Sequence, residues 1–425
     1  MAVVAASIFV LMYAVIVSEK IHRTVAAMLG AIAMILMGIL THTQAISHID
    51  FNTLGLLIGM MILVGVTSHT GVFDYVAIKA AKVAKAEPKR ILIYLALITA
   101  VFSGFLDNVT TVLLMVPVTF SITQKLHLKA SPFLLTQIIA SNIGGTATLI
   151  GDPPNIMIGS AAKELTFMAF IENLAPIAII NLIIVIFIIE FIYRKSLHTK
   201  PELQQEIMEL DEKASIKNRS LLHRSLFVLG LTLLGFFTHS LTHIESSLIA
   251  LTGGFLLLLL AGGSVHLVET TMKSVEWATI FFFVGLFIAV GGLIETGIIG
   301  MLAQKAIELT GGNVTSTSLL VLWLSAIVSS VLDNIPFVAT MIPLINDMGA
   351  MGIANLEPIW WSLALGACLG GNGTLVGASA NLIVAGLAME RGVKITFIKY
   401  FVLGFPIMIL TIIISTVYVY IRYLM

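Results

Sequence analysis

The sequence is poor in charged residues and in cysteine. Only 11% of its 425 residues are Asp, Glu, Lys or Arg, whereas soluble proteins carry about 25%. The net charge is zero, which argues against nucleic acid as a partner. The single cysteine, Cys368, excludes an internal disulfide and any metal site made of several cysteines. There is no nucleotide-binding loop, nucleophile arrangement or cofactor fingerprint. We therefore expect neither an enzyme nor a cofactor, apart from a bound Na⁺ if the protein is Na⁺-coupled.

Long apolar runs take the place of charge. Hydrophobic residues make up 58% of the chain and the mean hydropathy is +1.04, which predicts an all-α polytopic membrane protein. The first run lacks the basic flank and cleavage site of a signal peptide, so we expect a retained helix. Segments able to cross about 30 Å of hydrocarbon are approximately 2–17, 24–40, 51–67, 132–162 and 167–193, then 225–240, 246–262, 277–293, 358–388 and 397–423.

The two halves of the chain repeat each other with an offset of 226 residues. The shared residues are Asp, Asn, Gly, Thr and Pro inside apolar runs. The matched positions are Asp107-Asn108 and Asp333-Asn334, Pro117 and Pro343, Gly144-Gly145 and Gly370-Gly371, Thr148 and Thr374, and Asn155 and Asn381. A duplicated membrane segment that keeps such residues is typical of a secondary transporter built from two structural repeats. We expect repeat 1 at 1–193, a cytoplasmic linker at 194–224 and repeat 2 at 225–425.

Two further apolar stretches, 91–122 and 317–348, are too long for a single span. Each is interrupted near its middle by an Asp-Asn pair. This pattern predicts one re-entrant helical hairpin per repeat, with the pair at its tip. Because lipid does not tolerate irregular backbone, both tips must be buried among other helices.

The distribution of basic residues supports five crossings per repeat. The loops expected on the cytoplasmic side hold all but Lys163, Lys305 and Arg422 of the 23 Lys and Arg, as the positive-inside rule requires. This topology predicts an N-terminus outside the cytoplasmic (cell inner) membrane. Because five is odd, the second repeat is inverted relative to the first. Both hairpin tips are then expected near the bilayer midplane, where such transporters bind substrate and coupling ion.

Asp107 and Asp333 are the leading candidates for ion binding. A carboxylate in mid-membrane is costly, so it is expected to pair, face a cavity or titrate, which suits a carrier of H⁺ or Na⁺. The alternative is that each Asp only caps a helix and forms a turn, which explains two symmetry-related copies less well. Asn108 and Asn334 would add carbonyl ligands or cap helices.

The spanning segments 132–162 and 358–388 are predicted to be broken helices. Glycine pairs, and Pro153-Pro154 in the first segment, free backbone groups that bind ions at half-helix ends. Asp152, whose counterpart is Ala378, is either a third titrating carboxylate or a cap, and Cys368 is expected to be buried apolar packing. The neutral candidates for ion or substrate binding are Asn142, Gly144, Gly145, Thr146, Thr148 and Asn155, with Gly371, Asn372, Thr374 and Asn381.

The text around these residues resembles the ion transporter superfamily in its ArsB/NhaD branch, near the citrate-transporter-like permeases that include the melanosomal P protein. The stretches that carry the resemblance are FLDNVTTVLLMVPVT at 105–119, NIGGTATLIGDPPNIMI at 142–158, DNIPFVATMIP at 333–343 and the run 365–374. The likeness covers nearly the whole chain. It implies scaffold and transport domains, a homodimer and elevator-type alternating access.

The hairpin tips depart from one pattern in this superfamily. Related dicarboxylate/sodium symporters carry Ser-Asn-Thr at each tip, which binds Na⁺ and the substrate carboxylate. Here the tips read Asp107-Asn108-Val109 and Asp333-Asn334-Ile335, and the sequence offers no obvious Lys or Arg partner. The added negative charge disfavours simple Na⁺/dicarboxylate symport. It favours proton coupling or direct transport of a cation.

These observations lead to one expectation and two alternatives. We expect a secondary active transporter, embedded in lipid, that moves a small inorganic or organic anion coupled to H⁺ or Na⁺. Asp107 and Asp333 would carry the coupling ion and would be the metal ligands if that ion is Na⁺. The first alternative is a Na⁺/H⁺ antiporter without an organic substrate, and the second, from another class, is a passive anion channel.

Overall fold

The computed structural model describes residues 1–18 and 20–425, and every regular element in this part of the chain is a helix. The predicted all-α architecture is therefore confirmed. The helices of the first half are α1 (Ala2–Val17), α2 (Arg23–Leu36), α3 (His42–Ser47), α4 (Phe51–Ser68), α5 (Val72–Val83), α6 (Pro88–Leu106), α7 (Asn108–Lys125), α8 (Ser131–Thr146), α9 (Pro153–Ala161) and α10 (Phe167–Tyr193).

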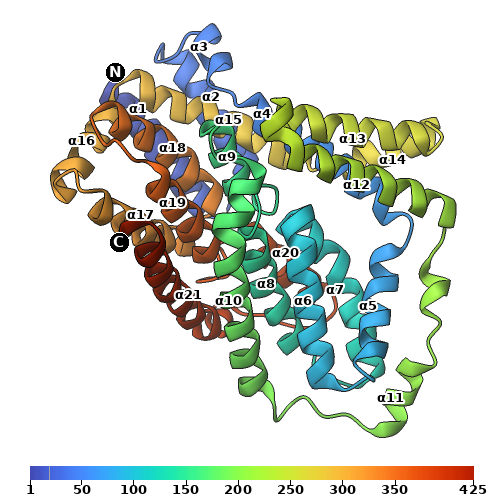
Figure 1. The fold of residues 1–425 in the computed structure, drawn as a ribbon. Coiled ribbons are helices and arrows are strands. Elements are labelled where there is room, and N and C mark those ends of the chain that lie inside the picture. The colour runs from blue at the N-terminus through green and yellow to red at the C-terminus, as the bar shows by residue number, and fades with distance from the viewer. Residues whose placement is uncertain (19) are drawn as a thin grey trace.

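The linker holds two short helices, and the second half repeats the order of the first (Figure 1). The linker helices are α11 (Pro201–Met208) and the 3₁₀ turn η1 (Glu212–Ser215). The remaining helices are α12 (Arg219–Thr242), α13 (Ser246–Leu260), α14 (Val265–Ser274), α15 (Trp277–Glu295), α16 (Ile298–Thr310), α17 (Val314–Val331), α18 (Asn334–Ala350), α19 (Glu357–Gly370), α20 (Ser379–Glu390), α21 (Phe397–Val419) and the π-helical end η2 (Tyr420–Leu424).

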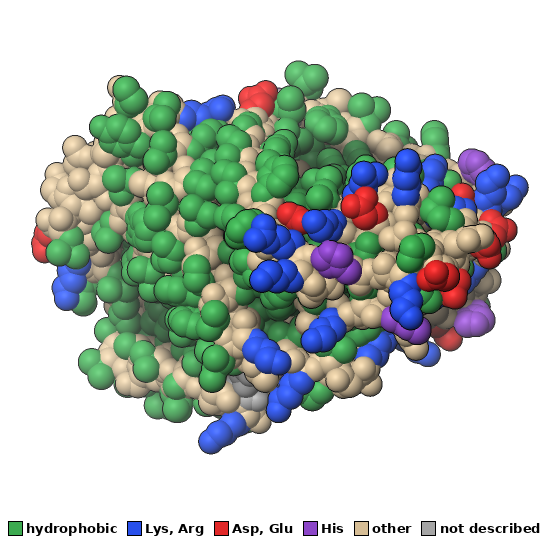
Figure 2. All heavy atoms as spheres, turned by 90° about the horizontal axis from the view of Figure 1, so that it is seen from below, with side chains coloured by type: hydrophobic (Ala, Val, Ile, Leu, Met, Phe, Trp, Pro, Cys, Tyr) green, Lys and Arg blue, Asp and Glu red, His purple; other side chains and the backbone are tan. Residues whose placement is uncertain are grey.

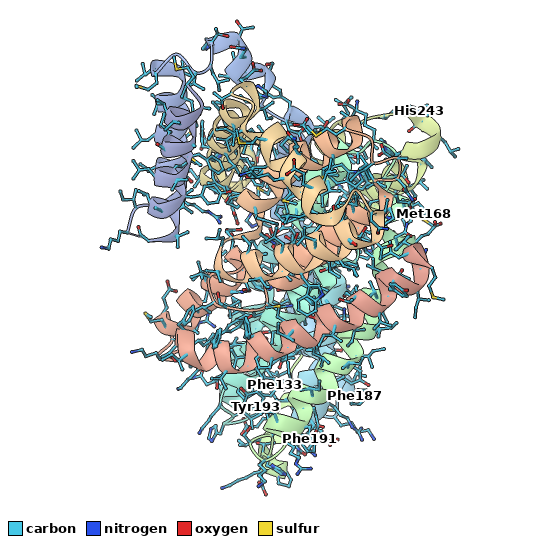
Figure 3. All side chains as sticks on the ribbon, turned by 90° about the vertical axis from the view of Figure 1, so that its left-hand side faces the viewer. Phe133, Met168, Phe187, Phe191, Tyr193 and His243 are labelled. Carbon is cyan, nitrogen blue, oxygen red and sulfur yellow. The ribbon has the colours of Figure 1, made fainter. Side chains whose placement is uncertain are left out.

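Seven helices of the described chain are long and apolar enough to cross a membrane, namely α4, α6, α10, α12, α15, α17 and α21. The protein is a multi-pass membrane protein. The spans predicted at 2–17, 24–40 and 246–262 correspond to the shorter apolar helices α1, α2 and α13. On α10, Phe187 and Phe191 are 64% and 61% exposed (Figure 3), as expected of side chains that face lipid.

Basic side chains and apolar side chains occupy different parts of the surface. Figure 2 shows lysine and arginine gathered over the middle and right of one face, while the left of that face is mainly hydrophobic. This separation matches a protein whose basic loops lie in water beside a lipid-facing surface.

The repeat is visible in local geometry as well as in the order of helices. Helices α5 and α16 each begin after a glycine in the left-handed conformation, Gly71 (φ 80°) and Gly297 (φ 74°). Residues with a Cβ rarely adopt this conformation. The two glycines are 226 positions apart, so the duplicated register preserves the turn and not merely the composition.

Two groups of helices can be distinguished by their packing. The first group, here called the frame, consists of α1, α2, α4, α12, α13 and α15. Within the frame, α2 packs along α15 and α4 along α13, so each of these contacts joins a helix of one repeat to a helix of the other (Figure 1). In the second group, here called the hairpin body (α6–α9 and α17–α20), α6 packs on α8, α17 on α19, α7 on α20 and α18 on α9. The hairpin body therefore also combines both repeats.

Glycine allows the broken helices to lie directly against the hairpins. A Cβ on Gly144 of α8 would lie 2.1 Å from the carbonyl oxygen of Ala100 in α6. At the matched position, a Cβ on Gly370 of α19 would lie 2.7 Å from the carbonyl oxygen of Ala326 in α17. Real Cβ atoms do not approach backbone so closely, so the two glycines are required for helix contact.

We predict that Gly144→Ala destabilises the protein by about 1–3 kcal/mol, because the new methyl group overpacks the α6–α8 contact. The measurement is the unfolding temperature of purified protein in detergent. Gly230→Ala in α12 is the matched control, since nothing lies within 4 Å of its added Cβ. That control should be neutral or stabilising by about 0.5–1 kcal/mol. Equal unfolding temperatures for Gly144→Ala and wild type would contradict the requirement for close approach.

Candidate functional site

The tips of both hairpins and the broken helices meet the frame around a small enclosed space, here called the inner cavity. Its volume is about 20 Å³, roughly the room needed for one water molecule or bare ion. It lies between helices of both repeats. The lining residues are Arg23, Leu57, Met61, Asp107, Asn108, Val109, Asp152, Pro153, Glu276, Thr279, Asn334, Ile335 and Ser379.

Asp107 forms the first hairpin tip and is at once a helix cap and a cavity wall. Its carboxylate accepts hydrogen bonds from the backbone N–H of Thr110 at 2.8 Å and from Thr110 Oγ1 at 2.6 Å. Its backbone has φ 87° and ψ 156°, a region that essentially only glycine adopts without strain. Asp107 adopts this strained backbone conformation while its side chain faces the cavity. This combination indicates that the side chain itself is needed there.

Asp333 forms the second tip and has a partner that the sequence did not reveal. The Nη1 atom of Arg23, at the start of α2, lies 2.5 Å from Asp333 Oδ2. The same guanidinium donates to Ser379 Oγ at 2.5 Å, and Ser379 Oγ in turn donates to Asp333 Oδ2 at 2.9 Å. The expectation that the site has no Lys or Arg partner is therefore wrong. Arg23 is the first residue of α2 and lies 310 residues from Asp333, so the sequence pattern near Arg23 gives no sign of this contact.

Asp152 faces the inner cavity as a third carboxylate. It stands at the N-cap position of α9 but makes no side-chain cap hydrogen bond. Instead both its carboxylate oxygens lie 3.4 Å from Asn334 Nδ2, next to the second hairpin tip. Of the two interpretations of Asp152, its geometry favours the carboxylate directed at the site over the cap.

A buried network of asparagines joins the two repeats behind the cavity. Asn142 Nδ2 lies 3.0 Å from the side-chain oxygens of both Asn372 and Asn381. Asn108 Nδ2 lies 3.4 Å from Asn142 Oδ1, which links the network to the first tip. The side-chain nitrogen of Asn372 is buried without an acceptor within the described chain. An orphaned buried donor is rare in folded proteins and indicates a place where an additional acceptor is favourable.

The other predicted polar residues hold backbone rather than line the cavity. Asn155 donates to the carbonyl oxygens of Thr146 and Thr148 at 3.1 and 2.9 Å, and Asn381 donates to those of Gly371 and Thr374 at 2.8 and 3.0 Å. These bonds satisfy the carbonyls that the helix breaks set free. The hydroxyls of Thr148 and Thr374 donate to the backbone of Gly104 and Ser330 in the hairpins.

Gly144, Gly145 and Thr146 also have structural contacts. Gly144 packs against α6, a Cβ on Gly145 would lie 2.6 Å from the carbonyl oxygen of Gly151, and Thr146 Oγ1 donates to the backbone oxygen of Asn142 at 2.8 Å. The structure thus places Asp107, Asn108, Asp152 and Asn334 at the cavity. The other candidates lie beside it or support it.

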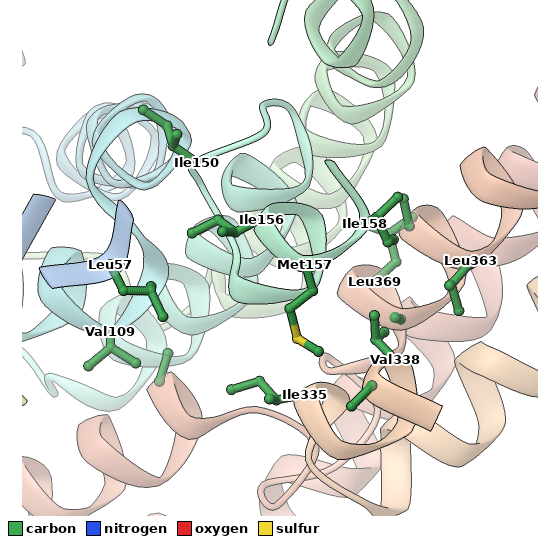
Figure 4. Close-up of a cluster of buried hydrophobic side chains, with 14 of the residues drawn as sticks. Leu57, Val109, Ile150, Ile156, Met157, Ile158, Ile335, Val338, Leu363 and Leu369 are labelled. Atoms are coloured by element: carbon green, nitrogen blue, oxygen red, sulfur yellow. The ribbon is translucent and has the colours of Figure 1, made fainter. Parts of the chain in front are cut away.

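Apolar side chains from both repeats close the region around the tips (Figure 4). Val109 and Ile335 follow the two Asp-Asn pairs and are 9% and 3% exposed. In Figure 4, Val109 lies next to Leu57 of α4 and Ile335 next to Met157 of α9. The hydrophobic surround keeps water away from the carboxylates and strengthens their electrostatic interactions.

Four polar or charged residues at the cavity were not predicted as site residues: Arg23, Glu276, Thr279 and Ser379. Thr279 Oγ1 donates to Glu276 Oε2 at 2.9 Å. The internal repeat could have indicated Glu276. It lies 226 residues after Asp50, so the two form a second matched pair of acidic residues, like Asp107 and Asp333. Cys368, expected only as packing, is buried but also contacts the polar network, with its Sγ 3.4 Å from Asn155 Oδ1.

A larger cleft lies elsewhere and contains no hairpin-tip residue. Its volume is about 1400 Å³, and it lies between the end of α7, the start of α8, the end of α10 and the α20–α21 connection. Its charged lining residues are Lys129, Arg391, Lys394 and Lys399. The carboxylates from both repeats gather at the smaller inner cavity, so the inner cavity is the candidate site.

Comparison with known proteins agrees with this architecture. The model of the CitMHS family, described as citrate transporter, matches residues 13–366. The chain belongs to this family. The protein is therefore a transporter and not an enzyme.

Relatives include both bacterial and animal proteins. An uncharacterized transporter of Mycobacterium tuberculosis strain H37Rv is 42% identical over 429 residues, covering 100% of this chain and 99% of the relative. The human P protein is 35% identical over 490 residues, covering 96% of this chain and 58% of its own length. The crystal structure of the YdaH transporter of Alcanivorax borkumensis superposes with a TM-score of 0.60 at 16% identity, covering 90% of this chain and 88% of the other. This last likeness supports the fold.

We predict that glycine has opposite effects on stability at the two tips. Asp107→Gly removes backbone strain of about 1–3 kcal/mol and loses only a few tenths of a kcal/mol of capping, so it should unfold at the same temperature as wild type or higher. Asp333 has an ordinary φ of −53° and an ion pair, so Asp333→Gly should lower the unfolding temperature. Thermal unfolding in detergent measures both. A clear loss of stability in Asp107→Gly would show that the side-chain contacts outweigh the strain.

Proposed function

We propose that the protein is a secondary active transporter that moves a small anion, coupled to H⁺ or Na⁺, by elevator-type alternating access. The hairpin body would be the transport domain and the frame the scaffold domain. The proposal includes a homodimer in the cytoplasmic membrane with the N-terminus outside. The observation that carries it is the convergence of carboxylates and helix N-termini from both repeats on one cavity between these two groups of helices.

The carboxylates are suited to hold the coupling cation. Asp107, Asp152 and Glu276 line a cavity that is only about 20 Å³ in volume. Neighbouring carboxylates in apolar surroundings repel one another, and a proton or a Na⁺ ion relieves the repulsion. Both ions are small enough for this cavity, whereas an organic anion is not. Binding of an organic anion therefore requires a conformation in which the hairpin body has moved relative to the frame and the cavity is wider.

Helix N-termini supply the attraction for an anion. Asn108, Pro153, Asn334 and Ser379 are the first residues of α7, α9, α18 and α20, and all four line the inner cavity. Each helix N-terminus carries roughly half a positive charge and unpaired N–H groups. Once the coupling cation neutralises the carboxylates, these four ends favour an anion. Binding of cation and anion is then mutually dependent, which is the requirement for coupled transport.

Cation/proton antiport without an organic substrate is the second candidate. It is favoured by the charges at the cavity, where three carboxylates are accompanied by a single arginine, Arg23. A passive anion channel receives less support, because the cavity is closed by apolar residues and lined by carboxylates that would repel the permeating ion.

We predict that Asp107→Asn and Asp152→Asn each lower gradient-driven transport about tenfold or more, the effect of losing an ion contact of about 1.4 kcal/mol. Asparagine keeps the size and capping ability of Asp. The assay uses purified protein in liposomes loaded with a pH-sensitive dye, first with an imposed Na⁺ gradient alone and then with citrate or inorganic anions. Asp74→Asn is the control, since Asp74 lies in the first turn of α5 and lines neither the inner cavity nor the cleft of about 1400 Å³.

The assay separates the candidates. A pH change that requires an anion supports proton-coupled anion transport, while Na⁺ flux that requires an anion supports the Na⁺-coupled form. A pH change driven by Na⁺ alone supports antiport. Full transport in both Asn variants would show that the carboxylates are structural and would reject the coupling mechanism.

A further inference from the structure

Arg23 connects the frame to the hairpin body at the cavity. On the frame side, its guanidinium carbon lies 5.0 Å from the ring centre of Phe282, and its Nη2 lies 3.5 Å from Thr279 Oγ1, both on α15. On the other side, Nη1 contacts Asp333 and Ser379. These two contacts belong to the second hairpin tip and to the start of α20. Arg23 is therefore held by one group of helices while it neutralises a carboxylate of the other.

The same contact separates two cavities. A second space of about 310 Å³, here called the outer cavity, lies between α1, the start of α2, the second hairpin tip and α20. Arg23 and Ser379 line both the outer cavity and the inner cavity, whereas Asp333 lines the outer and Asn334 the inner. The cluster Arg23–Asp333–Ser379 thus stands at the boundary between the two spaces.

The contact breaks the symmetry of the repeats. Helices α2 and α13 match with an offset of 223 residues, since Ala27 meets Gly285 as Ala250 meets Gly59. The position matched to Arg23 is therefore Ser246, the first residue of α13, which carries no charge to pair with Asp107. Asp107 is bonded within its own hairpin through Thr110, whose counterpart is Pro336. The two duplicated carboxylates have therefore acquired different surroundings. Only the carboxylate of Asp333 is engaged by an arginine of the frame.

We propose that Arg23 is a tethered cation that occupies Asp333 in the empty transporter and closes the passage between the outer and inner cavities. Arrival of the coupling cation at Asp333 displaces the guanidinium and opens the passage, and departure of that cation lets Arg23 return. The charge at Asp333 is balanced in both situations. The competition part rests on the proposed function, whereas the closure part depends only on the geometry of the two cavities.

Competition for Asp333 is tested by Arg23→Gln in the liposome assay. Without its competitor, the coupling cation should reach half-maximal transport at a concentration about fivefold lower, the effect of an ion pair worth about 1 kcal/mol. Arg23→Lys should remain close to wild type. Arg224→Gln is the matched control, because Arg224 donates to the backbone oxygen of Leu260 and lines neither cavity. Na⁺ and protons are titrated separately. An unchanged half-saturation concentration for both would reject competition.

If the cation is the proton, several charged or titratable groups act on the result besides Asp333. Those lining the two cavities are Tyr13 on α1, His22 and Arg23 at the start of α2, Asp107 at the first tip, Asp152 before α9 and Glu276 before α15. Asp152→Asn and Glu276→Gln, each introduced into the Arg23→Gln background, show how much these two carboxylates contribute to the shift in half-saturation concentration. The shift caused by Arg23→Gln should persist in both double variants if it arises at Asp333. Its loss in either double variant would assign the shift to that other carboxylate and reject competition at Asp333.

Closure of the passage is tested by thiol labelling, which needs no transport. In a Cys368→Ala background, Met61→Cys reports on the inner cavity and Leu382→Cys on the outer cavity. Ag⁺, a thiol-reactive ion small enough for the inner cavity, should label the inner position slowly when Arg23 is present, and the thiols that remain free are counted with N-ethylmaleimide after denaturation. Arg23→Gln should accelerate that labelling about tenfold, the effect of removing contacts worth about 1.4 kcal/mol. The outer position should be labelled equally in both.

The two arms fail independently. If inner-cavity labelling is the same with Arg23, Arg23→Lys and Arg23→Gln, while thermal unfolding shows all three to be folded, Arg23 does not close the passage. If labelling responds to Arg23 but wild-type liposomes show no ion-coupled flux, the closure stands and the proposed coupling is rejected.

Discussion

Breaking a helix inside a membrane leaves backbone carbonyl and amide groups that lipid cannot solvate, and the rest of this structure follows from how those groups are satisfied. Asn155 and Asn381 fold back onto the loop carbonyls of the two breaks, and the hydroxyls of Thr148 and Thr374 bond to the hairpins. Each break is therefore tied to its hairpin by side chains of the duplicated motif. This explains why the motif contains Asn and Thr, which hydrogen-bond without carrying a fixed charge.

The same breaks generate the electrostatic character of the site. Each hairpin tip and each helix break starts a new helix, so four N-termini point at one place while three carboxylates neutralise them in part. Neither set is stable alone in apolar surroundings, since like charges gathered in a low dielectric repel strongly. In the proposed function, the arrival of a single proton or Na⁺ ion would change the balance between these two sets of charges.

The sequence predicted the features that depend on local pattern and on the internal repeat. The hairpins, the helix breaks and the two tip carboxylates all follow from Asp, Gly and Pro inside apolar runs, because these residues have few other uses in lipid. Contacts between distant segments did not follow. Arg23 meets Asp333 across 310 residues, and its loop looks like any basic loop on the cytoplasmic side. Ser379 was equally hidden, since a small helix residue becomes a site residue only when another helix faces it, whereas Glu276 was indicated by its match with Asp50.

The difference between the repeats also bears on the preferred conformation. In an inverted-repeat transporter, exchange of the conformations of the two repeats generates the state open to the opposite side. That exchange would place Asp107 where Asp333 now meets Arg23, but the residue matched to Arg23 at the start of α13 is the uncharged Ser246. The ion pair therefore stabilises the conformation described here and has no equivalent in the other. A partly exposed ion pair of about 1 kcal/mol shifts such an equilibrium about fivefold. Loading a cation onto Asp333 would remove that bias, so the event that neutralises the carboxylate would also free the hairpin body to move.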